Sequence, residues 1–177
     1  MTLFKRITIV TTLVGVSFLV LGLVAYASGA RINNTRSIPV GLYWMTSDPI
    51  EKGAYVIFCP PPMGVFDEAK ERGYIGAGFC PGGYGYMMKR ILAAKDDAVT
   101  IDNEGVRVNG ELLPLSTPIA ADKAGRPLPR YQADSFTLGG SELLLMSDVS
   151  AISFDGRYFG PISRLQIKGV IRPVFTW

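Results

Sequence analysis

One serine, Ser37, and one lysine, Lys89, are the candidates for nucleophilic chemistry in this chain. The 177 residues include no histidine. This absence excludes Ser-His-Asp and Cys-His catalysis, together with most metal sites built on histidine ligands. A nucleophilic mechanism would therefore need Lys, Asp, Glu or Tyr as its base.

Lys89 lies inside the apolar run 86–93, whose composition predicts a β-strand. On a strand Lys89 shares its face with Met87 and Ile91, whereas Arg90 points to the other face. Loss of hydration on an apolar face lowers the pKa of a lysine. A fall of about three pKa units, equivalent to about 4 kcal/mol, would make Lys89 a useful general base near neutral pH. The alternative is that its stem packs on apolar residues while the ammonium reaches solvent.

Ser37 lies in a segment that Pro39 and Gly41 constrain. Proline biases the preceding Ile38 toward extended geometry. A rigid backbone can hold a hydroxyl and a nearby N–H in fixed positions, and both a nucleophile and an oxyanion site require this. Taken alone, a serine in such a loop is most often a turn residue.

The bulk composition narrows the class of partner and the compartment. The net charge is only +3, and no dense basic run follows the first residues, so we expect no nucleic-acid partner. Cys59 and Cys80 form a candidate disulfide, which fits an oxidising compartment. The loop of about 20 residues would contribute roughly 3 kcal/mol. Two unpaired thiols are the alternative, because the sequence does not give the Cα separation. We expect neither metal nor cofactor.

The N-terminus predicts a membrane segment. Lys5 and Arg6 precede the uncharged run 7–27, which is long enough for the roughly 20 residues that span a bilayer. Positive charge before the span favours a cytoplasmic N-terminus. We expect residues 1–28 to form an anchor and residues 29–177 one domain outside the cytoplasmic membrane, in a periplasm-like space. Ala25-Tyr26-Ala27 also fits the end of a cleavable signal, which would leave the domain periplasmic.

Many short strands separated by glycine-containing turns predict a mainly β, antiparallel domain. We expect residues 28–35 to be a tether, 65–72 a short helix, 76–85 a glycine-rich loop and 113–132 a surface excursion or flap. The expected strands are residues 41–44, 54–58, 86–93, 99–102, 106–108, 111–115, 135–138, 142–146 and 167–174.

Three ordered regions resemble the type I signal peptidase (leader peptidase) family. They are residues 34–43, residues 86–92 continuing into Val-Arg-Val-Asn-Gly at 106–110, and Ser-Phe-Asp-Gly-Arg-Tyr-Phe-Gly at 153–160. In that family a serine followed by x-Pro, close after a membrane anchor, is the nucleophile. A lysine followed by arginine and apolar residues is its base. The resemblance thus implies Ser37 as nucleophile, Lys89 as base and an antiparallel β domain of the signal-peptidase type.

Two departures from the family pattern affect the supporting residues. Thr35 stands where the family often has a serine that donates to the oxyanion, and its hydroxyl could keep that role. Gly156 stands where the family has a serine that orients the lysine. Ser153 or Asp155 could take over this orienting role. The alternative for Asp155 is a structural salt bridge to Arg157 or a loop cap.

The short chain and the sequence Ser-Ile-Pro-Val-Gly-Leu-Tyr at 37–43 are most similar to the conjugative-transfer, TraF-type branch of the family. The resemblance implies plasmid conjugation as the setting and a membrane-associated pilin or preprotein as substrate, with the lipid bilayer as second partner. Cleavage in that branch can be coupled to pilin cyclisation, because an N-terminal amine can replace water in resolving an acyl-enzyme.

Two other functions fit parts of the sequence. A non-catalytic periplasmic β module of a conjugation or secretion apparatus would need only the anchor and exposed loops. A Ser-Lys protease of the self-cleaving repressor kind would share the two catalytic residues. The N-terminal apolar run and the lack of a DNA-binding head argue against the repressor.

Overall fold

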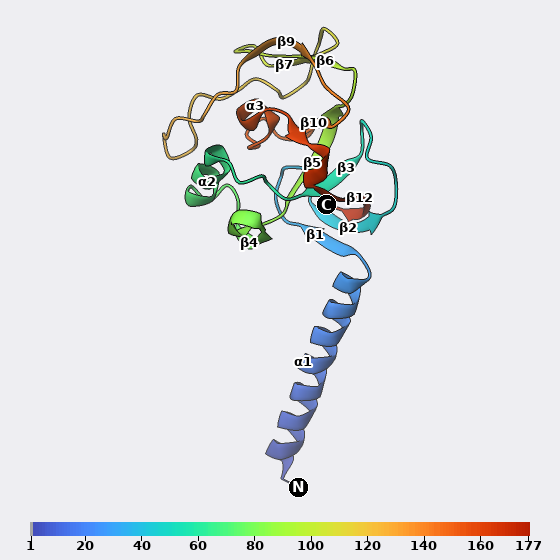
Figure 1. The fold of residues 1–177 in the computed structure, drawn as a ribbon. Helices are drawn as coiled ribbons and strands as arrows, with labels where there is room; N and C mark the ends of the chain where they lie inside the picture. The colour runs from blue at the N-terminus through green and yellow to red at the C-terminus, as the bar shows by residue number, and fades with distance from the viewer. Residues whose placement is uncertain (1) are drawn as a thin grey trace.

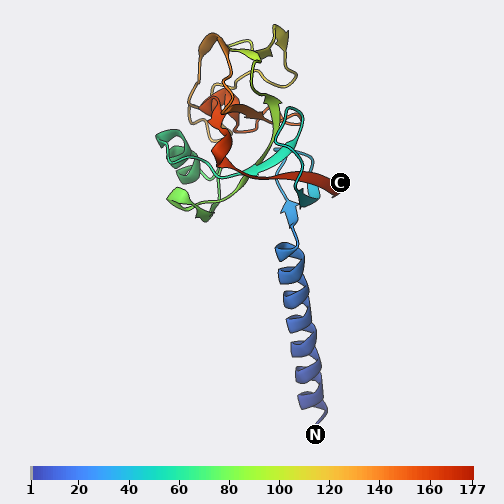
Figure 2. The same ribbon diagram turned by 45° about the vertical axis from the view of Figure 1, so that its right-hand side comes forward.

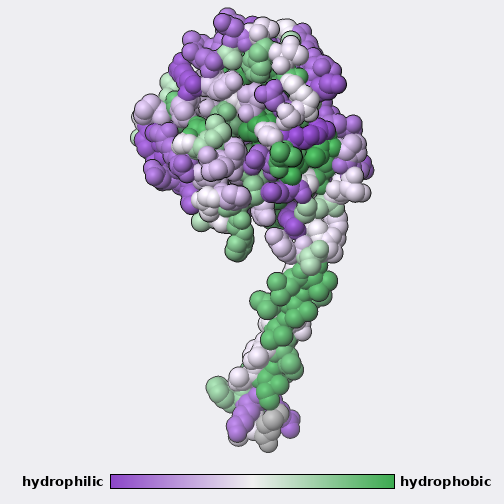
Figure 3. Space-filling model, in the orientation of Figure 1, coloured by the Kyte–Doolittle hydropathy of each residue, from purple (hydrophilic) through white to green (hydrophobic). Residues whose placement is uncertain are grey.

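The N-terminal helix α1 (Leu3–Ala27) stands clear of the rest of the chain (Figure 1). The computed structural model describes residues 2–177, so Met1, the first residue of the predicted anchor segment 1–28, lies outside them. No α1 residue is buried, and the face of the helix seen in Figure 3 is mostly apolar beyond its first turns, unlike the mixed surface of the domain. By length and composition alone, α1 is suited to crossing a membrane.

The domain is built on a seven-stranded sheet in which every neighbouring pair is antiparallel. Its strands in spatial order are β1 (Ala30–Asn33), β2 (Gly41–Thr46), β12 (Ile167–Thr176), β3 (Tyr55–Phe58), β5 (Met87–Ala93), β10 (Glu142–Met146) and β11 (Ile162–Ser163). Because β5 lies between β3 and β10, it is an interior strand that is paired along both edges.

A smaller four-stranded sheet lies at the end of the domain far from α1 (Figures 1 and 2). Its order is β8 (Glu111–Leu112), β7 (Val106–Val108), β6 (Ala98–Ile101) and β9 (Ala133–Thr137). The remaining elements are α2 (Gly64–Glu71), β4 (Ala77–Cys80), η1 (Pro81–Gly83), α3 (Gly156–Phe159) and η2 (Arg164–Gln166). The predicted mainly β, antiparallel fold with one N-terminal helix is confirmed.

Three apolar clusters form the core. The largest packs α2 and α3 on the large sheet, with Phe66 and Phe159 ring centroids 4.9 Å apart. A second fills the space beneath the small sheet. The third joins Ile38 and Tyr43 to Ile57 and Ile171, and so anchors the loop that carries Ser37.

Two expected loops contain regular structure. The prediction that all of residues 28–35 form a tether is wrong. Ala30–Asn33 pairs with β2 as an edge strand, and only Ser28 and Gly29 connect this strand to α1. The predicted loop 76–85 contains β4 and η1. A disulfide joins Cys59 at the end of β3 to Cys80 in β4. The disulfide fixes the segment 76–85 to the end of β3, whereas its glycine content predicted only a loop.

Candidate active site

Lys89 is buried on β5, an interior strand of the large sheet. The residues of β5 alternate between buried and half-buried, and Met87, Lys89, Ile91 and Ala93 form the buried face. Lys89 is only 2% exposed, so the alternative in which its ammonium reaches solvent is wrong. Burial lowers the pKa of Lys89 to about 8, while the nearby Asp155 carboxylate opposes this shift. The direction and cause are those that the alternation predicts.

Ser37 lies in a turn between β1 and β2 that is fixed from beneath by Asn33. The buried Asn33 amide donates to the carbonyls of Thr35, Ile38 and Pro39. Its Oδ1 accepts from the Thr35 amide and hydroxyl. Asn33 was not among the predicted site residues. The feature that could have indicated Asn33 is its residue type, because asparagine side chains often form hydrogen bonds with the backbone of a neighbouring turn.

Tyr43 fixes the same turn from the other end. Its hydroxyl donates to the Pro39 carbonyl at 2.6 Å, and its ring is buried. Burial raises the pKa of Tyr43 to about 12, so Tyr43 stays a neutral donor at physiological pH and cannot serve as the base. The fully buried Ile38 completes this attachment. The Ser37 backbone is therefore held in one place before substrate arrives.

Thr35 lies beside the Ser37 hydroxyl. The Thr35 hydroxyl donates to Asn33 Oδ1 at 2.9 Å and lies 3.4 Å from Ser37 Oγ. The second distance is long for a bond between two hydroxyls. The Thr35 hydroxyl therefore lies close to the place where Ser37 Oγ would attack a carbonyl, but in this structure its hydrogen-bond acceptor is Asn33 Oδ1.

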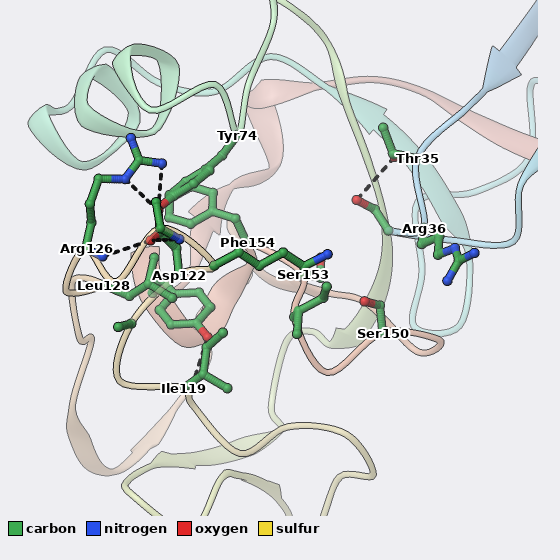
Figure 4. Close-up of a pocket in the computed structure, with 16 residues that line it drawn as sticks. Thr35, Arg36, Tyr74, Ile119, Asp122, Arg126, Leu128, Ser150, Ser153 and Phe154 are labelled. Carbon is green, nitrogen blue, oxygen red and sulfur yellow. Dashed lines mark hydrogen bonds and ion pairs between the residues drawn. The ribbon is translucent and has the colours of Figure 1, made fainter.

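Ser37 opens into a cavity of about 550 Å³ (Figure 4). One wall carries Thr35, Arg36 and Ser37, and another carries residues 119–128 of the long irregular segment. That segment is tied to the domain, because Asp122 accepts from the Tyr74 hydroxyl and the Pro127 carbonyl accepts from Arg72. Residues 119–128 therefore help to shape the cleft, whereas no residue of 76–85 lines it.

Ser153 belongs to the same cavity, and its hydroxyl has no hydrogen-bond partner within residues 2–177. The residue is 7% exposed. An unpaired hydroxyl in such a position is uncommon and calls for an explanation. Its backbone carbonyl, in contrast, accepts from the Arg157 guanidinium at 2.9 Å.

Asp155 and Arg157 form a fully buried ion pair. Arg157 Nε and Nη2 donate to the two Asp155 oxygens at 2.8 and 2.9 Å. Asp155 also caps α3 by accepting from the Arg157 amide, and it accepts from the Ser147 amide. The structure thus shows both the salt bridge and the cap that were the alternative for Asp155. Burial is the main cause of the lowered pKa of Lys89; the charge of Asp155 opposes it and the charge of Arg157 adds to it.

The structure brings Thr35, Ser37 and Ser153 to one cavity and Lys89 to the neighbourhood of Asp155. No hydrogen bond joins Ser37 to Lys89 in the described chain. Hydrogen bonds between catalytic groups are often long without substrate and tighten in the complex. Among residues 2–177, no group of acidic or cysteine side chains could hold a metal ion.

Comparison with known proteins gives relatives over nearly the whole chain. The family described as signal peptidase, peptidase S26, matches residues 2–177. A plasmid transfer protein TraF from Escherichia coli is 73% identical over 175 residues, covering 99% of this chain and 98% of that protein. A conjugal transfer protein TraF from Agrobacterium fabrum is 36% identical over 160 residues, covering 89% and 87%. A signal peptidase I structure from Enterococcus faecalis V583 aligns with 72% of this chain and 100% of its own, at 15% identity and a TM-score of 0.40.

Proposed function

The chain belongs to the signal peptidase family, peptidase S26, and from this premise we propose that it is a serine endopeptidase with a Ser37–Lys89 dyad. Its relatives named for plasmid and conjugal transfer support a peptidase-like role in conjugation. The observation that carries the dyad is the buried Lys89, whose pKa is lowered to about 8. With that pKa, roughly one Lys89 in ten is neutral at pH 7, compared with about one in a few thousand for an exposed lysine.

In the first half-reaction, neutral Lys89 takes the proton of the Ser37 hydroxyl while Ser37 Oγ attacks the scissile carbonyl. The protonated Lys89 then gives its proton to the leaving amine, and the C–N bond breaks to form an acyl-enzyme. Movement of the Lys89 side chain or binding of substrate must bring the two groups into hydrogen-bond contact. The rigid Ser37 turn favours movement on the lysine side.

The oxyanion of the tetrahedral intermediate is stabilised by the Ser37 amide and the Thr35 hydroxyl. To donate, the Thr35 hydroxyl has to exchange its bond to Asn33 Oδ1 for the oxyanion. A hydrogen bond to a charged oxygen is stronger than one to a neutral amide oxygen, so the exchange is favoured as charge develops.

Ser153 is the better of the two orienting candidates. Its hydroxyl is buried, lies in the cavity with Ser37 and has no other partner. Both Asp155 oxygens already accept from Arg157, so Asp155 acts on Lys89 through its charge. We therefore assign the hydrogen bond that aims the lysine amine to the Ser153 hydroxyl.

The proposed substrate is a membrane-bound pilin precursor of the conjugation apparatus. The acyl-enzyme can be resolved by water or by the N-terminal amine of the same polypeptide, which would give a cyclic product. The helix α1 supports an anchor in the bacterial inner membrane with the domain on the periplasmic side, since Lys5 and Arg6 lie in its first turn, before the uncharged run 7–27.

The test is mass spectrometry of the pilin from cells that carry the full-length chain or its Ser37→Ala variant. Wild type should give a shortened pilin, lighter by one further water where it is cyclised, and Ser37→Ala should leave the precursor intact. Ser150→Ala is the matched control, because Ser150 lines the same cavity without a proposed chemical role. Normal processing by Ser37→Ala would reject the dyad and favour the non-catalytic module.

A further inference from the structure

We propose that the hairpin formed by β4 and η1, with Phe79 at its tip, inserts into the interfacial layer of the bilayer. It would give the domain a second membrane contact beside α1. The inference rests on the proposed function only in taking α1 as an uncleaved anchor.

Phe79 is the starting point, because it is 98% exposed and no other large apolar side chain among residues 2–177 is as exposed. The sequence around it carries no charged residue from Gly73 to Met88. Insertion of this hairpin would therefore bury aromatic surface without removing any charge of its own from water. Aromatic side chains also favour the boundary between lipid and water.

The hairpin is held rigidly, so Phe79 cannot fold back onto the domain without breaking contacts. Its base is fixed by the disulfide to Cys59 and by a bridge between Cys80 and Tyr84. Lys70 Nζ donates to the Gly82 carbonyl at 3.1 Å. A Cβ on Gly78 would lie 2.7 Å from the backbone of Gly85, so the two arms approach as closely as glycine allows.

The junction between α1 and the domain fixes which face meets the membrane. Only two residues separate α1 from β1, and the amides of Ser28 and Gly29 bond back to the last helical turn. The Arg31 guanidinium lies 4.0 Å from the Tyr26 ring centroid and donates to the Tyr26 carbonyl. The side chain of Trp44, in β2, lies close against Gly29. Tyrosine and tryptophan at the end of a span are typical of the membrane interface.

β4 lies at the same end of the domain as this junction. Figures 1 and 2 both place β4 and β1 at the lower edge, on the α1 side. Figure 3 shows an apolar projection at that edge. The hairpin therefore lies on the side of the domain that faces α1 and that would face a membrane crossed by α1.

The bilayer fits this surface better than a protein partner does. A stable protein interface buries about 1,200–2,000 Å², and one projecting aromatic residue flanked by Gly78 and the disulfide-bonded Cys80 offers far less. A weak membrane contact is sufficient, because α1 already holds the hairpin beside the lipid at a high effective concentration.

The first test uses the full chain in vesicles of phosphatidylethanolamine and phosphatidylglycerol, with p-benzoylphenylalanine in place of Phe79. The matched control carries it in place of Leu112, which is exposed in the small sheet at the far end of the domain. We expect a phospholipid adduct at position 79 and none at position 112. A folded protein without a lipid adduct at 79, or with a protein adduct there, would overturn the inference.

The second test is Phe79→Ser, which removes the apolar side chain without disturbing any packed contact. We expect a several-fold loss in processing of the membrane-bound precursor and no loss with a peptide substrate in detergent. An equal loss in both assays would contradict the membrane role. The cross-linking result does not depend on catalysis, so it tests the hairpin even where the Ser37→Ala experiment rejects the peptidase.

Discussion

Lys89 and Arg157 are two buried cations whose surroundings differ completely. Arg157 is fully buried, pairs with both Asp155 oxygens and donates to the carbonyls of Leu115, Ala151 and Ser153. Lys89 is 2% exposed and makes no hydrogen bond within residues 2–177. The difference shows that burial alone does not create reactivity. A buried charge with matched partners is structural, and one without partners is driven toward its neutral form.

The residue types suit these two situations. The planar guanidinium of arginine presents five donors and keeps its charge, whereas the lysine ammonium loses its proton readily when it is buried. Arg157 thereby joins the segment at 115–117 to the loop at 150–155. Lys89, which has no such partners, loses its proton more readily and can present a neutral amine. Each of the following changes alters one side of the comparison.

Lys89→Met should have the largest effect on activity of any single change. Removal of a catalytic base in serine peptidases lowers turnover by about 10⁴-fold or more. Methionine keeps the length of the side chain and suits the apolar face, so folding should be retained. Precursor processing and circular dichroism measure the two effects. Lys168→Met, on an exposed residue, is the control; unchanged processing by Lys89→Met would refute the role of the base.

Arg157→Met should affect stability more than any other single change at the site. Removing one partner of a buried pair leaves the other charge unpaired and costs about 3–5 kcal/mol. Denaturant unfolding measures this loss. Arg107→Met is the control, because its salt bridge to Glu104 is exposed and such pairs contribute about 1 kcal/mol or less. Similar losses for both variants would show that the buried pair is not special.

The stability of wild type relative to Lys89→Met should depend on pH in one defined window. The pKa of Lys89 is about 8 in the folded protein and 10.5 for an ordinary lysine. Between these values the unfolded chain binds more protons, so folded wild type gains stability as pH rises. The gain should total about 3 kcal/mol. Below pH 8 Lys89 is protonated in both states, so the free energy of unfolding of wild type is lower than that of Lys89→Met by a constant amount. A flat difference between pH 8 and 10.5 would contradict the lowered pKa.

Ser153→Ala should have the smallest effect, and mainly on turnover. We expect kcat to fall by about ten- to a hundredfold, less than for loss of the base itself because general acid–base catalysis contributes about 10²–10⁴-fold, with little change in KM. Stability should hold or rise slightly, since the hydroxyl has no partner to lose. Ser153→Thr retains the hydroxyl and should restore part of the rate. If the pH dependence of kcat does not move in Ser153→Ala, the hydroxyl does not act on the lysine.

The sequence predicted local features better than long-range ones. The alternation around Lys89 was sufficient to predict its burial, because strand geometry puts Met87, Lys89 and Ile91 on one face. Helix α2 and most strands lie within two or three residues of their predicted ranges. The edge strand β1 was missed because its pairing depends on β2, and residues 30–33 have no strong pattern of their own.

The support of the site was harder to predict. Asn33 acts through backbone carbonyls up to six residues away, and Arg157 reaches carbonyls about 40 residues away. Every residue has a backbone carbonyl, so the residue types of the acceptors do not indicate such hydrogen bonds. The short helix α3 depends on the Asp155 cap, which the sequence suggested only as an alternative to a catalytic role.

The two-residue connection between α1 and β1 has a consequence for substrate choice under the proposed function. A rigid connection fixes the height of Ser37 above the bilayer, in contrast to a long linker, which would let the domain sample many heights. A precursor held by its own apolar span would be cleaved only where its scissile bond reaches that height. Position along the substrate, counted from the membrane, would then select the bond together with the residues that flank it.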